Sequence, residues 1–430
     1  MAGYVEDRWL TKKPDPATGK RRETARHGKG KRWRVAGVPG VKDRSFTTEA
    51  AAKKWLKESA TDSERGTFYD PRDGEMLLQE YVEKHWWPNL RRAPTTKQSM
   101  RPRVFNHILP HVGHLPLNRI GHDEVKAWQT RAEEDIDTGT LVVTWRNFSS
   151  IMQAAHKAKR IPVNPFRDPD LVAPTVPKSK AKAWSDATLA AVRAELATRY
   201  QMLADLGFTS GLRQGEAFGV SPDDVDGDVL RVVRQIINVN GRLAFGPPKG
   251  NKEREAPCPP ELARAIKEYA DTFPPVEVTL PWVDPDRPNL AWEARPSRTV
   301  RLLVTTGHTG KVRGGAVSRD MFNELHWKPA LAAAGVIPAS TEKSGRRVKY
   351  RMPREDGFHV LRHTFASVVL AEGETIGQLA AWLGHADPAF TLRTYVHFMP
   401  KSGIKAVAAL GGMLSRVASA ADAGGTPENL

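Results

Sequence analysis

The 430-residue sequence contains a single cysteine, Cys258. One thiol cannot form an internal disulfide, which fits a protein of the reducing cytoplasm. The first residues carry no apolar signal core, and no run of about 18 apolar residues occurs anywhere. We therefore expect a cytoplasmic protein that has no membrane partner.

The sequence also lacks the motifs on which nucleotide-dependent and metal-dependent enzymes rely. It has no glycine-rich loop followed by Lys-Ser or Lys-Thr, and no evident carboxylate cluster for magnesium. His107, His111 and His114 lie near one another, but Pro110 separates the first two and no cysteine or carboxylate stands beside them. Ordinary loop histidines are favoured over a zinc site, and we predict neither a metal nor a cofactor.

Positive charge is what the chain has in excess. Lys and Arg number 65 against 49 Asp and Glu, which gives a formal net charge of +16, and the sequence pI is near 9.9. Such a balance favours a polyanionic partner, most commonly nucleic acid. The alternative is a basic surface that serves solubility.

The length predicts two or three domains at roughly 100–200 residues each. The first segment, 1–65, is rich in Lys, Arg and Gly. It predicts short strands at Trp33–Val38 and around Ser45–Thr47, then a helix at Glu49–Glu58 capped by Thr48. The exposed face of so small a sheet, with Arg32 and Arg34, suits a DNA groove. The alternative is a basic, partly disordered tail.

The second segment, 67–166, predicts four helices from its apolar spacing. They are Glu75–Trp86, Thr95–Ile108, His122–Ala132 and Thr138–Lys159. We expect the second to be kinked or restarted at Pro102 and ended by Pro110. These helices carry many basic residues, of which Arg101, Arg103 and Arg146 are candidates for DNA contacts. The alternative is that these residues belong to ordinary solvated helix faces.

A proline-containing, lysine-rich stretch, 167–183, predicts an extended linker whose lysines can track phosphates, namely Lys178, Lys180 and Lys182. The third segment, 184–415, opens with a helix capped near Ser185 and closes with an amphipathic helix at Ile404–Val417. The tail, 416–430, is expected to be disordered. The polar stretch 274–319 matches no motif, and we expect strand and loop there.

Five short polar stretches of the third segment predict one site. They are Gly211–Glu216, Pro248–Gly250, His359–His363, Leu383–His385 and Thr394–His397. Together they offer two arginines, a lysine, histidines and a tyrosine. Fixed cations to hold phosphate oxygens, a proton donor and a hydroxyl nucleophile suit a reaction at a phosphodiester.

Local patterns place several of these side chains. Gly211 is expected to end one helix and Leu212 to begin the next, so that Arg213 sits in its first turn and Glu216 can orient it. Strands at Val229–Val233 and Arg242–Phe245 predict a hairpin with an Asn-Gly turn, followed by Lys249.

The stretch His359–His363 predicts a helix on which His359, Arg362 and His363 share one face. A histidine pair that binds metal, or two surface histidines, are the alternatives. Gly384 can end the preceding helix in a left-handed conformation and so place His385 in the site. Tyr395 follows ten residues later.

In order and spacing these stretches resemble the tyrosine recombinases, the phage-integrase family. The resemblance covers nearly the whole chain and is strongest from Arg213 to Tyr395. It implies a multidomain protein that is mainly α with small β-sheets. Segment 1–65 would be an arm-type DNA-binding module, 67–166 a helical, SAM-like core-binding domain, and 184–415 a mixed α/β catalytic domain.

The resemblance also implies roles. Tyr395 would be the nucleophile, forming a 3′-phosphotyrosyl link without ATP. Arg213 and Arg362 would neutralise the phosphate, and His385 would donate a further hydrogen bond. The remaining implied roles are His359 assisting proton transfer, Lys249 protonating the leaving 5′ oxygen with Lys252 as its rival, and Glu216 and His363 in support.

The implied partners are double-stranded DNA attachment sites and a homotetramer on DNA, with a host DNA-bending factor and an excision directionality factor as accessories. Integration of mobile DNA in a bacterial host is the expected function. A chromosome-resolving recombinase, a type IB topoisomerase and a non-catalytic DNA-binding relative remain alternatives. The basic N-terminal module argues for the integrase.

Overall fold

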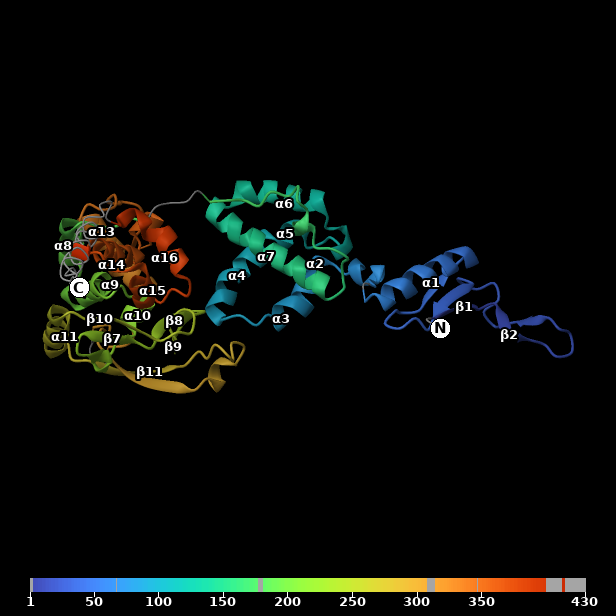
Figure 1. Cartoon of the computed structure of the whole chain (residues 1–430), viewed down its shortest axis with the longest axis horizontal. Coiled ribbons are helices and arrows are strands. Elements are labelled where there is room, and N and C mark those ends of the chain that lie inside the picture. Colours follow the sequence, from blue (N-terminus) through green and yellow to red (C-terminus); the bar gives the residue numbers. More distant parts are fainter. Residues whose placement is uncertain are drawn as a thin grey trace, which may run out of the picture. The chain divides into compact units, whose positions relative to one another are not determined.

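The computed structural model describes residues 3–66, 68–176, 181–307, 314–345, 347–399 and 412–413. In these ranges the chain is mainly helical with small sheets, which confirms the predicted fold class (Figure 1). It divides into two compact units, residues 1–92 with 96–177, and residues 178–430 with 93–95. The predicted helix Ile404–Val417 and the linker residues Lys178 and Lys180 fall largely or wholly outside the described residues. None of the described helices combines the length and hydropathy that a membrane crossing demands.

The N-terminal part of the first unit is a small antiparallel sheet with one helix. Strand β4 pairs with β1 and β5, and a separate hairpin joins β2 to β3. The two predicted strands and the helix are confirmed, with Thr48 accepting the N–H of Ala51, but α1 runs six residues further than predicted. The elements are β1 Tyr4–Asp7, β2 Leu10–Pro14, β3 Arg21–Glu23, β4 Trp33–Ala36, β5 Arg44–Phe46 and α1 Glu49–Glu64.

The rest of this unit is helical around a core of its own. The four predicted helices are present, with corrections at their ends. Its elements are η1 Pro71–Glu75, α2 Leu78–Tyr81, η2 Val82–Trp86, α3 Trp87–Asn89, α4 Pro94–His107, α5 Leu109–Val112, η3 Leu117–Arg119, α6 His122–Asp135, α7 Thr138–Lys157 and η4 Pro165–Arg167.

Proline explains the corrections. Pro88 cannot donate a hydrogen bond, and the helix before it widens to a π-turn in which the Trp87 N–H reaches the Val82 carbonyl. Pro102 lies exposed within an unbroken α4, and Pro110 sits in the first turn of α5 instead of ending a helix.

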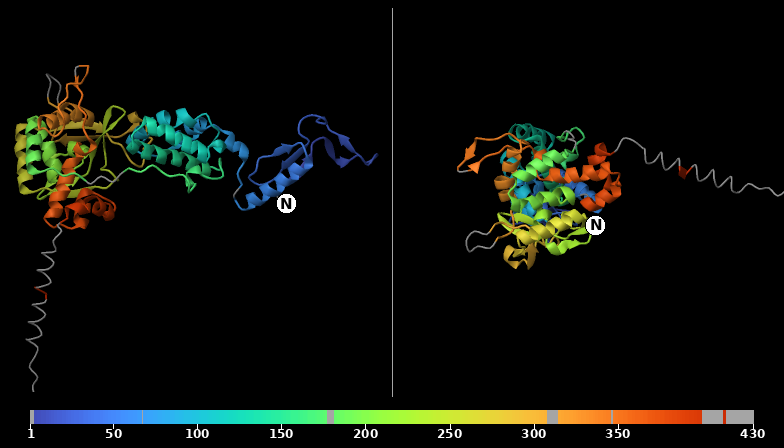
Figure 2. Two further views of the ribbon diagram at one scale, coloured as in Figure 1. Left: turned by 90° about the horizontal axis from the view of Figure 1, so that it is seen from above. Right: turned by 90° about the vertical axis from the view of Figure 1, so that its left-hand side faces the viewer.

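In the second unit most helices lie on one side of the strands, whereas α11 lies beside the strands (Figures 1 and 2). Its helices are α8 Asp186–Glu195, α9 Thr198–Thr209, α10 Gln214–Phe218, α11 Pro260–Thr272, α12 Arg319–Phe322, α13 Lys328–Ala333, α14 His359–Ala371, α15 Ile376–Leu383 and α16 Pro388–Tyr395, with a π-turn η7 Asn323–Trp327 and 3-10 turns η5 Pro222–Asp224, η6 Trp292–Ala294, η8 Arg354–Asp356 and η9 Val396–Phe398. Its strands are β6 Val225–Asp226, β7 Val229–Val232, β8 Gln235–Val239, β9 Arg242–Gly246, β10 Arg254–Pro257, β11 Val276–Pro281, β12 Ser297–Leu302, β13 Lys343–Ser344 and β14 Arg347–Val348.

The predicted hairpin of this unit is wrong in its first strand. The partner of β9 is β8, joined to it through Asn240-Gly241, whereas β7 pairs with β6 and β10. Asn240 (φ 52°) and Gly241 (φ 84°) both take the positive φ that a two-residue hairpin turn requires. The unmatched stretch 274–319 contains the antiparallel pair β11–β12, as strand and loop were expected there.

Candidate active site

The centre of the site is the guanidinium of Arg362, which is fully buried on α14. It donates to the carbonyls of Gly211 (2.8 Å) and Leu383, and its Nη2 lies 3.2 Å from Nε2 of His385. Its buried Nε has no hydrogen-bond partner among the described residues. Burial, and then the neighbouring arginine charges, lower the pKa of Arg362. An incoming anion would relieve this destabilisation of the cation.

Arg213 lies at the N-cap of α10. The prediction that Leu212 begins this helix is wrong, because Gly211 is left-handed (φ 64°) and Arg213 itself is extended (φ −71°, ψ 151°). Its Nη1 donates to Oε1 of Glu216 at 2.9 Å and its Nη2 to the Leu383 carbonyl at 3.2 Å. The backbone N–H of Arg213 donates to the other oxygen of Glu216 at 2.9 Å. Glu216 thus orients Arg213 as the sequence predicts.

Glu216 has a second cationic partner, Arg254 on β10, for which no role was predicted from the sequence. Arg254 donates to both carboxylate oxygens at 2.9 and 2.6 Å, and its Nε donates to the Trp382 carbonyl at 2.7 Å. Burial alone would raise the pKa of Glu216, but the hydrogen bonds and charges of Arg254 and Arg213 outweigh it and lower the pKa to about 2. The alternation of β10 puts Arg254 on the same side as buried Ala256, and this pattern is the signal that could have indicated a buried partner.

His385 follows the end of α15. Gly384 takes a left-handed conformation (φ 63°, ψ 43°), and the His385 N–H then bonds the carbonyl of Ala380 at 2.9 Å. The ring is fixed from both sides, by Arg362 at Nε2 and by the buried Thr391 hydroxyl, 2.7 Å from Nδ1. Burial and then nearby arginine charges lower the pKa of His385 to about 4.

We expect Gly384→Ala to weaken both the fold and the site. A Cβ at Gly384 would lie 2.9 Å from Cδ of Arg254, and an L-residue in this left-handed conformation costs about 1–2 kcal/mol. Thermal unfolding and single-turnover DNA cleavage should both decline.

The matched control is Gly377→Ala in the same helix, where an added Cβ meets nothing within 4 Å. This change should leave cleavage intact and slightly raise stability. If the two variants behaved alike, the conformation at Gly384 would not be what positions His385.

Tyr395 ends α16 and is buried, with 1% of its surface exposed. Its hydroxyl lies 2.8 Å from Nδ1 of His363. Burial raises the pKa of Tyr395 to about 12, although the charges of Arg362 and Arg213 act in the opposite direction. The phenol is therefore protonated at neutral pH and has to lose its proton when it reacts.

His359 begins α14, and its ring centroid lies 4.7 Å from that of His363. The residue reaches the surface, yet its pKa is lowered, first by partial burial of the ring and then by surrounding cationic groups that include Lys249. Lys249 is exposed on the turn between β9 and β10. Lys252 is exposed as well and lines a hollow of about 630 Å³ together with His385.

The arrangement has the electrostatics of an anion site. Arg213 and Arg254 pair with Glu216, whose charge also acts on the nearby Arg362. Among the described residues, these three cations and one carboxylate sum to a charge of +2. Guanidinium groups bind phosphate oxygens in pairs. A phenol, three histidines and a lysine lie around this cationic centre, so the site can combine phosphate binding with nucleophilic attack and proton transfer.

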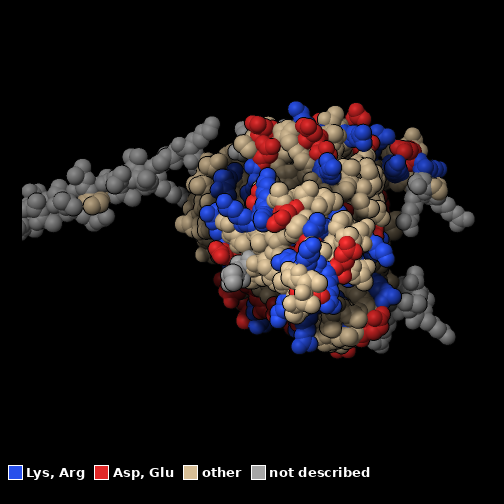
Figure 3. All heavy atoms as spheres, turned by 90° about the vertical axis from the view of Figure 1, so that its right-hand side faces the viewer, with Lys and Arg blue, Asp and Glu red and all other residues tan. Residues whose placement is uncertain are grey.

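The predicted DNA contacts outside the site stay predictions. Arg32 pairs with Asp7 at 2.8 Å, Arg34 pairs with Asp43, and Lys182 pairs with Asp356 at 2.5 Å. Figure 3 shows acidic side chains interleaved with basic ones on the visible face. The remaining candidates lie at the surface or partly buried, with Arg101 over the ring of Phe105, Arg103 bonded to the Ser99 carbonyl, and Arg146 exposed.

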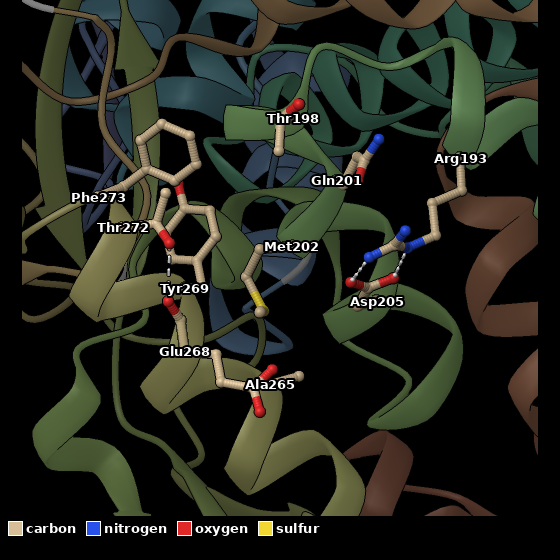
Figure 4. A pocket seen from close by; sticks show the side chains of 10 residues that line it. All are labelled: Arg193, Thr198, Gln201, Met202, Asp205, Ala265, Glu268, Tyr269, Thr272 and Phe273. Atoms are coloured by element: carbon tan, nitrogen blue, oxygen red, sulfur yellow. Dashed lines mark hydrogen bonds and ion pairs between the residues drawn. The ribbon is translucent and has the colours of Figure 1, made fainter.

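A second pocket of about 210 Å³ lies away from these residues, between α9 and α11 (Figure 4). Its main polar feature is the pair Arg193–Asp205, whose groups satisfy each other at 2.6 and 2.9 Å. Across the described ranges no three or more His, Cys, Asp or Glu side chains are grouped so as to hold a metal ion.

Comparison with known sequences gives relatives of one kind. The chain is 25% identical over 265 residues to a XerC-like tyrosine recombinase of Caldanaerobacter subterraneus subsp. tengcongensis, which covers 57% of this chain and 59% of that one. It is 24% identical over 369 residues to a putative prophage phiRv2 integrase of Mycobacterium tuberculosis, covering 83% and 85%. The chain spans only a little over half of the first two relatives, 59% and 52%. No protein-family model matches the chain.

Solved structures share the fold. The integrase of transposon Tn1549, in complex with a circular intermediate DNA, superposes with a TM-score of 0.58 at 16% identity, covering 78% of this chain and 99% of that one. A lambda integrase tetramer bound to a Holliday junction gives 0.51 at 11% identity, covering 94% and 97%. In its sequence relatives and in its fold, this chain is therefore similar to tyrosine recombinases and integrases.

Proposed function

We propose that the protein is a site-specific DNA recombinase that cuts and rejoins DNA through a tyrosine. One observation carries the proposal: Tyr395 lies close enough to the buried Arg362 for that charge to act on the pKa of its phenol, and Nε of Arg362 has no hydrogen-bond partner among the described residues. Burying a charged arginine whose Nε has no partner, among other positive charges, costs free energy unless an anion binds to it. A phosphodiester supplies that anion next to a nucleophile.

In the proposed reaction each residue of the site has its own role. Arg213 and Arg362 hold the non-bridging oxygens and stabilise the added charge of the five-coordinate transition state. His385 binds a phosphate oxygen once the anion replaces its contact with Arg362. Tyr395 attacks phosphorus, the bond to the 5′ oxygen breaks, and Lys249 gives that oxygen its proton. Glu216 and Arg254 position Arg213 without touching the phosphate.

Structures of similar fold support an assembly on DNA. The lambda structure is a tetramer on a Holliday junction and the Tn1549 structures hold DNA. We propose duplex attachment sites and a homotetramer for this chain, with accessory DNA-bending and directionality factors in a bacterial cytoplasm. The division into 1–65, 67–166, linker 167–183 and 184–415 belongs to the same proposal.

Mobile DNA is the substrate that the comparisons favour. The prophage integrase matches more than four fifths of both chains, whereas the XerC-like recombinase matches just over half of each. We therefore favour integration of phage or related DNA over chromosome resolution.

Covalent trapping tests the function. The protein is mixed with a nicked suicide duplex of its candidate attachment site, without metal or ATP, and then denatured. A protein–DNA adduct at the 3′-phosphate end of the cut strand is expected. Sequence-specific binding without any adduct would instead indicate a non-catalytic DNA-binding protein.

Lys249→Ala should slow cleavage of a normal phosphodiester by about 10²–10⁴-fold, because the leaving 5′ oxygen loses its acid. A 5′-bridging phosphorothiolate needs no such proton, since a thiolate leaves unaided, and cleavage of this substrate should return to near the wild-type rate. Lys252→Ala is the matched control, with wild-type cleavage of both substrates expected. The reverse pattern would assign the acid to Lys252.

A further inference from the structure

We propose that His363 is the base that takes the proton from Tyr395 during attack. This inference rests on the proposed function and adds to it a specific proton acceptor for the nucleophile. It departs from the sequence-based expectation, in which His359 assists proton transfer and His363 has a supporting role.

The geometry gives His363 direct contact with the reacting atom. Its Nδ1 lies 2.8 Å from the Tyr395 oxygen, and in the part of the chain that the structure describes no other side chain is seen to hydrogen-bond that hydroxyl. The proposal requires the neutral tautomer of His363 that carries its proton on Nε2, in which the phenol donates and Nδ1 accepts.

The surroundings keep His363 neutral. His359 and Arg362 face it from α14 and His397 faces it from η9 beyond Tyr395. Burial first, then the charges of Arg362 and His397, lower the pKa of His363 to about 4. A neutral imidazole beside a protonated phenol is the correct starting state for general-base catalysis.

His359 is less well placed to take the proton from Tyr395. It lies one helical turn before His363, with their ring centroids 4.7 Å apart, and it reaches the surface where Lys249 contributes to its field. That location faces an incoming phosphate and the lysine, whereas His363 faces the tyrosine.

The O–H bond of Tyr395 breaks as its oxygen forms a bond to phosphorus, and the proton passes to Nδ1 of His363, which becomes an imidazolium. The bond from phosphorus to the 5′ oxygen breaks, and the 5′ oxygen takes a proton from Lys249. On rejoining, a 5′ hydroxyl attacks phosphorus and gives its proton back to the neutral Lys249. The bond from phosphorus to the Tyr395 oxygen breaks, and the imidazolium of His363 returns its proton to the departing phenolate.

The test compares two variants on two suicide duplexes in the full-length protein, by the single-turnover rate of adduct formation. His363→Asn keeps a polar atom near the Nδ1 position but cannot hold a proton. We expect its rate to fall about 10²–10⁴-fold on the phosphodiester. The fall should persist on the 5′-phosphorothiolate, because a better leaving group does not replace the base. His359→Asn, the matched control on the same helix, should slow attack less.

Three results would overturn the inference: His363→Asn within about threefold of wild type, full recovery on the phosphorothiolate, or a larger loss in His359→Asn. His363→Ala offers a second measurement that does not depend on the Asn variant. Added imidazole should restore its adduct formation, and a flat response to imidazole would count against a proton acceptor at this position. Absence of any adduct with the wild type would instead refute the proposed function.

Discussion

Replacing Tyr395 with Phe should abolish the covalent adduct while leaving DNA binding within a few fold of wild type. The change removes the oxygen that attacks phosphorus and nothing that we assign to DNA binding. Phe fits the same space, and the ring keeps its packing against Phe365 and its neighbours in the cluster around α14 and α15. The loss of one hydrogen bond to the half-buried His363 should cost about 1 kcal/mol of stability. Adduct formation on a suicide duplex and a gel-shift titration measure the two properties separately.

Tyr350→Phe supplies the control, since Tyr350 lies in the same unit and has no assigned role in the chemistry. It should form adducts at the wild-type rate. An adduct from the Tyr395 variant would show that another side chain is the nucleophile. A loss of binding together with cleavage would show that the phenol supports the fold of the site.

The sequence predicted the constituents of the site better than their connections. Arg213, His359, Arg362 and His385 could be selected because each stands in a short motif with a predictable local geometry, such as a helical face or a glycine-ended helix. Tyr395 was selected by its place after these motifs. Gly384 is the clearest case, since an αL glycine followed by His385 was expected and is observed. The roles of these residues remain predictions.

The connections depend on tertiary packing, which local patterns do not contain. The ion pair of Arg254 with Glu216 joins residues 38 positions apart, and the bond of His363 to Tyr395 joins residues 32 apart. The hairpin error has the same origin, because β7 and β8 are both apolar enough to pair with β9 and only the sheet as a whole decides between them. The π-turn before Pro88 is a further case, in which proline changed the helix without ending it.

Glu216→Ala should destabilise the second unit by about 3–5 kcal/mol. Glu216 is fully buried and accepts hydrogen bonds from Arg213 and Arg254. Without it, two guanidinium groups remain with no carboxylate, beside the buried charge of Arg362, and an uncompensated buried charge is the costly outcome of breaking such a pair. Denaturant unfolding measures the loss, and faster hydrogen exchange at the amides of α14 and α15 should localise it.

The control for that loss is Glu293→Ala, which removes a largely exposed partner of Arg242 and should change stability by no more than about 0.5 kcal/mol.

The pH dependence of stability provides an independent check on the carboxylate of Glu216. Its folded pKa of about 2 lies below the ordinary value of 4.5, so its contribution is complete above about pH 5 and is lost as the pH falls toward 2. The difference is worth roughly 3 kcal/mol. Glu216→Gln, which keeps the shape but not the charge, should therefore be much less stable than wild type at pH 7 and approach it near pH 2. A constant gap across that range would mean that the stability of the network does not depend on the charge of Glu216.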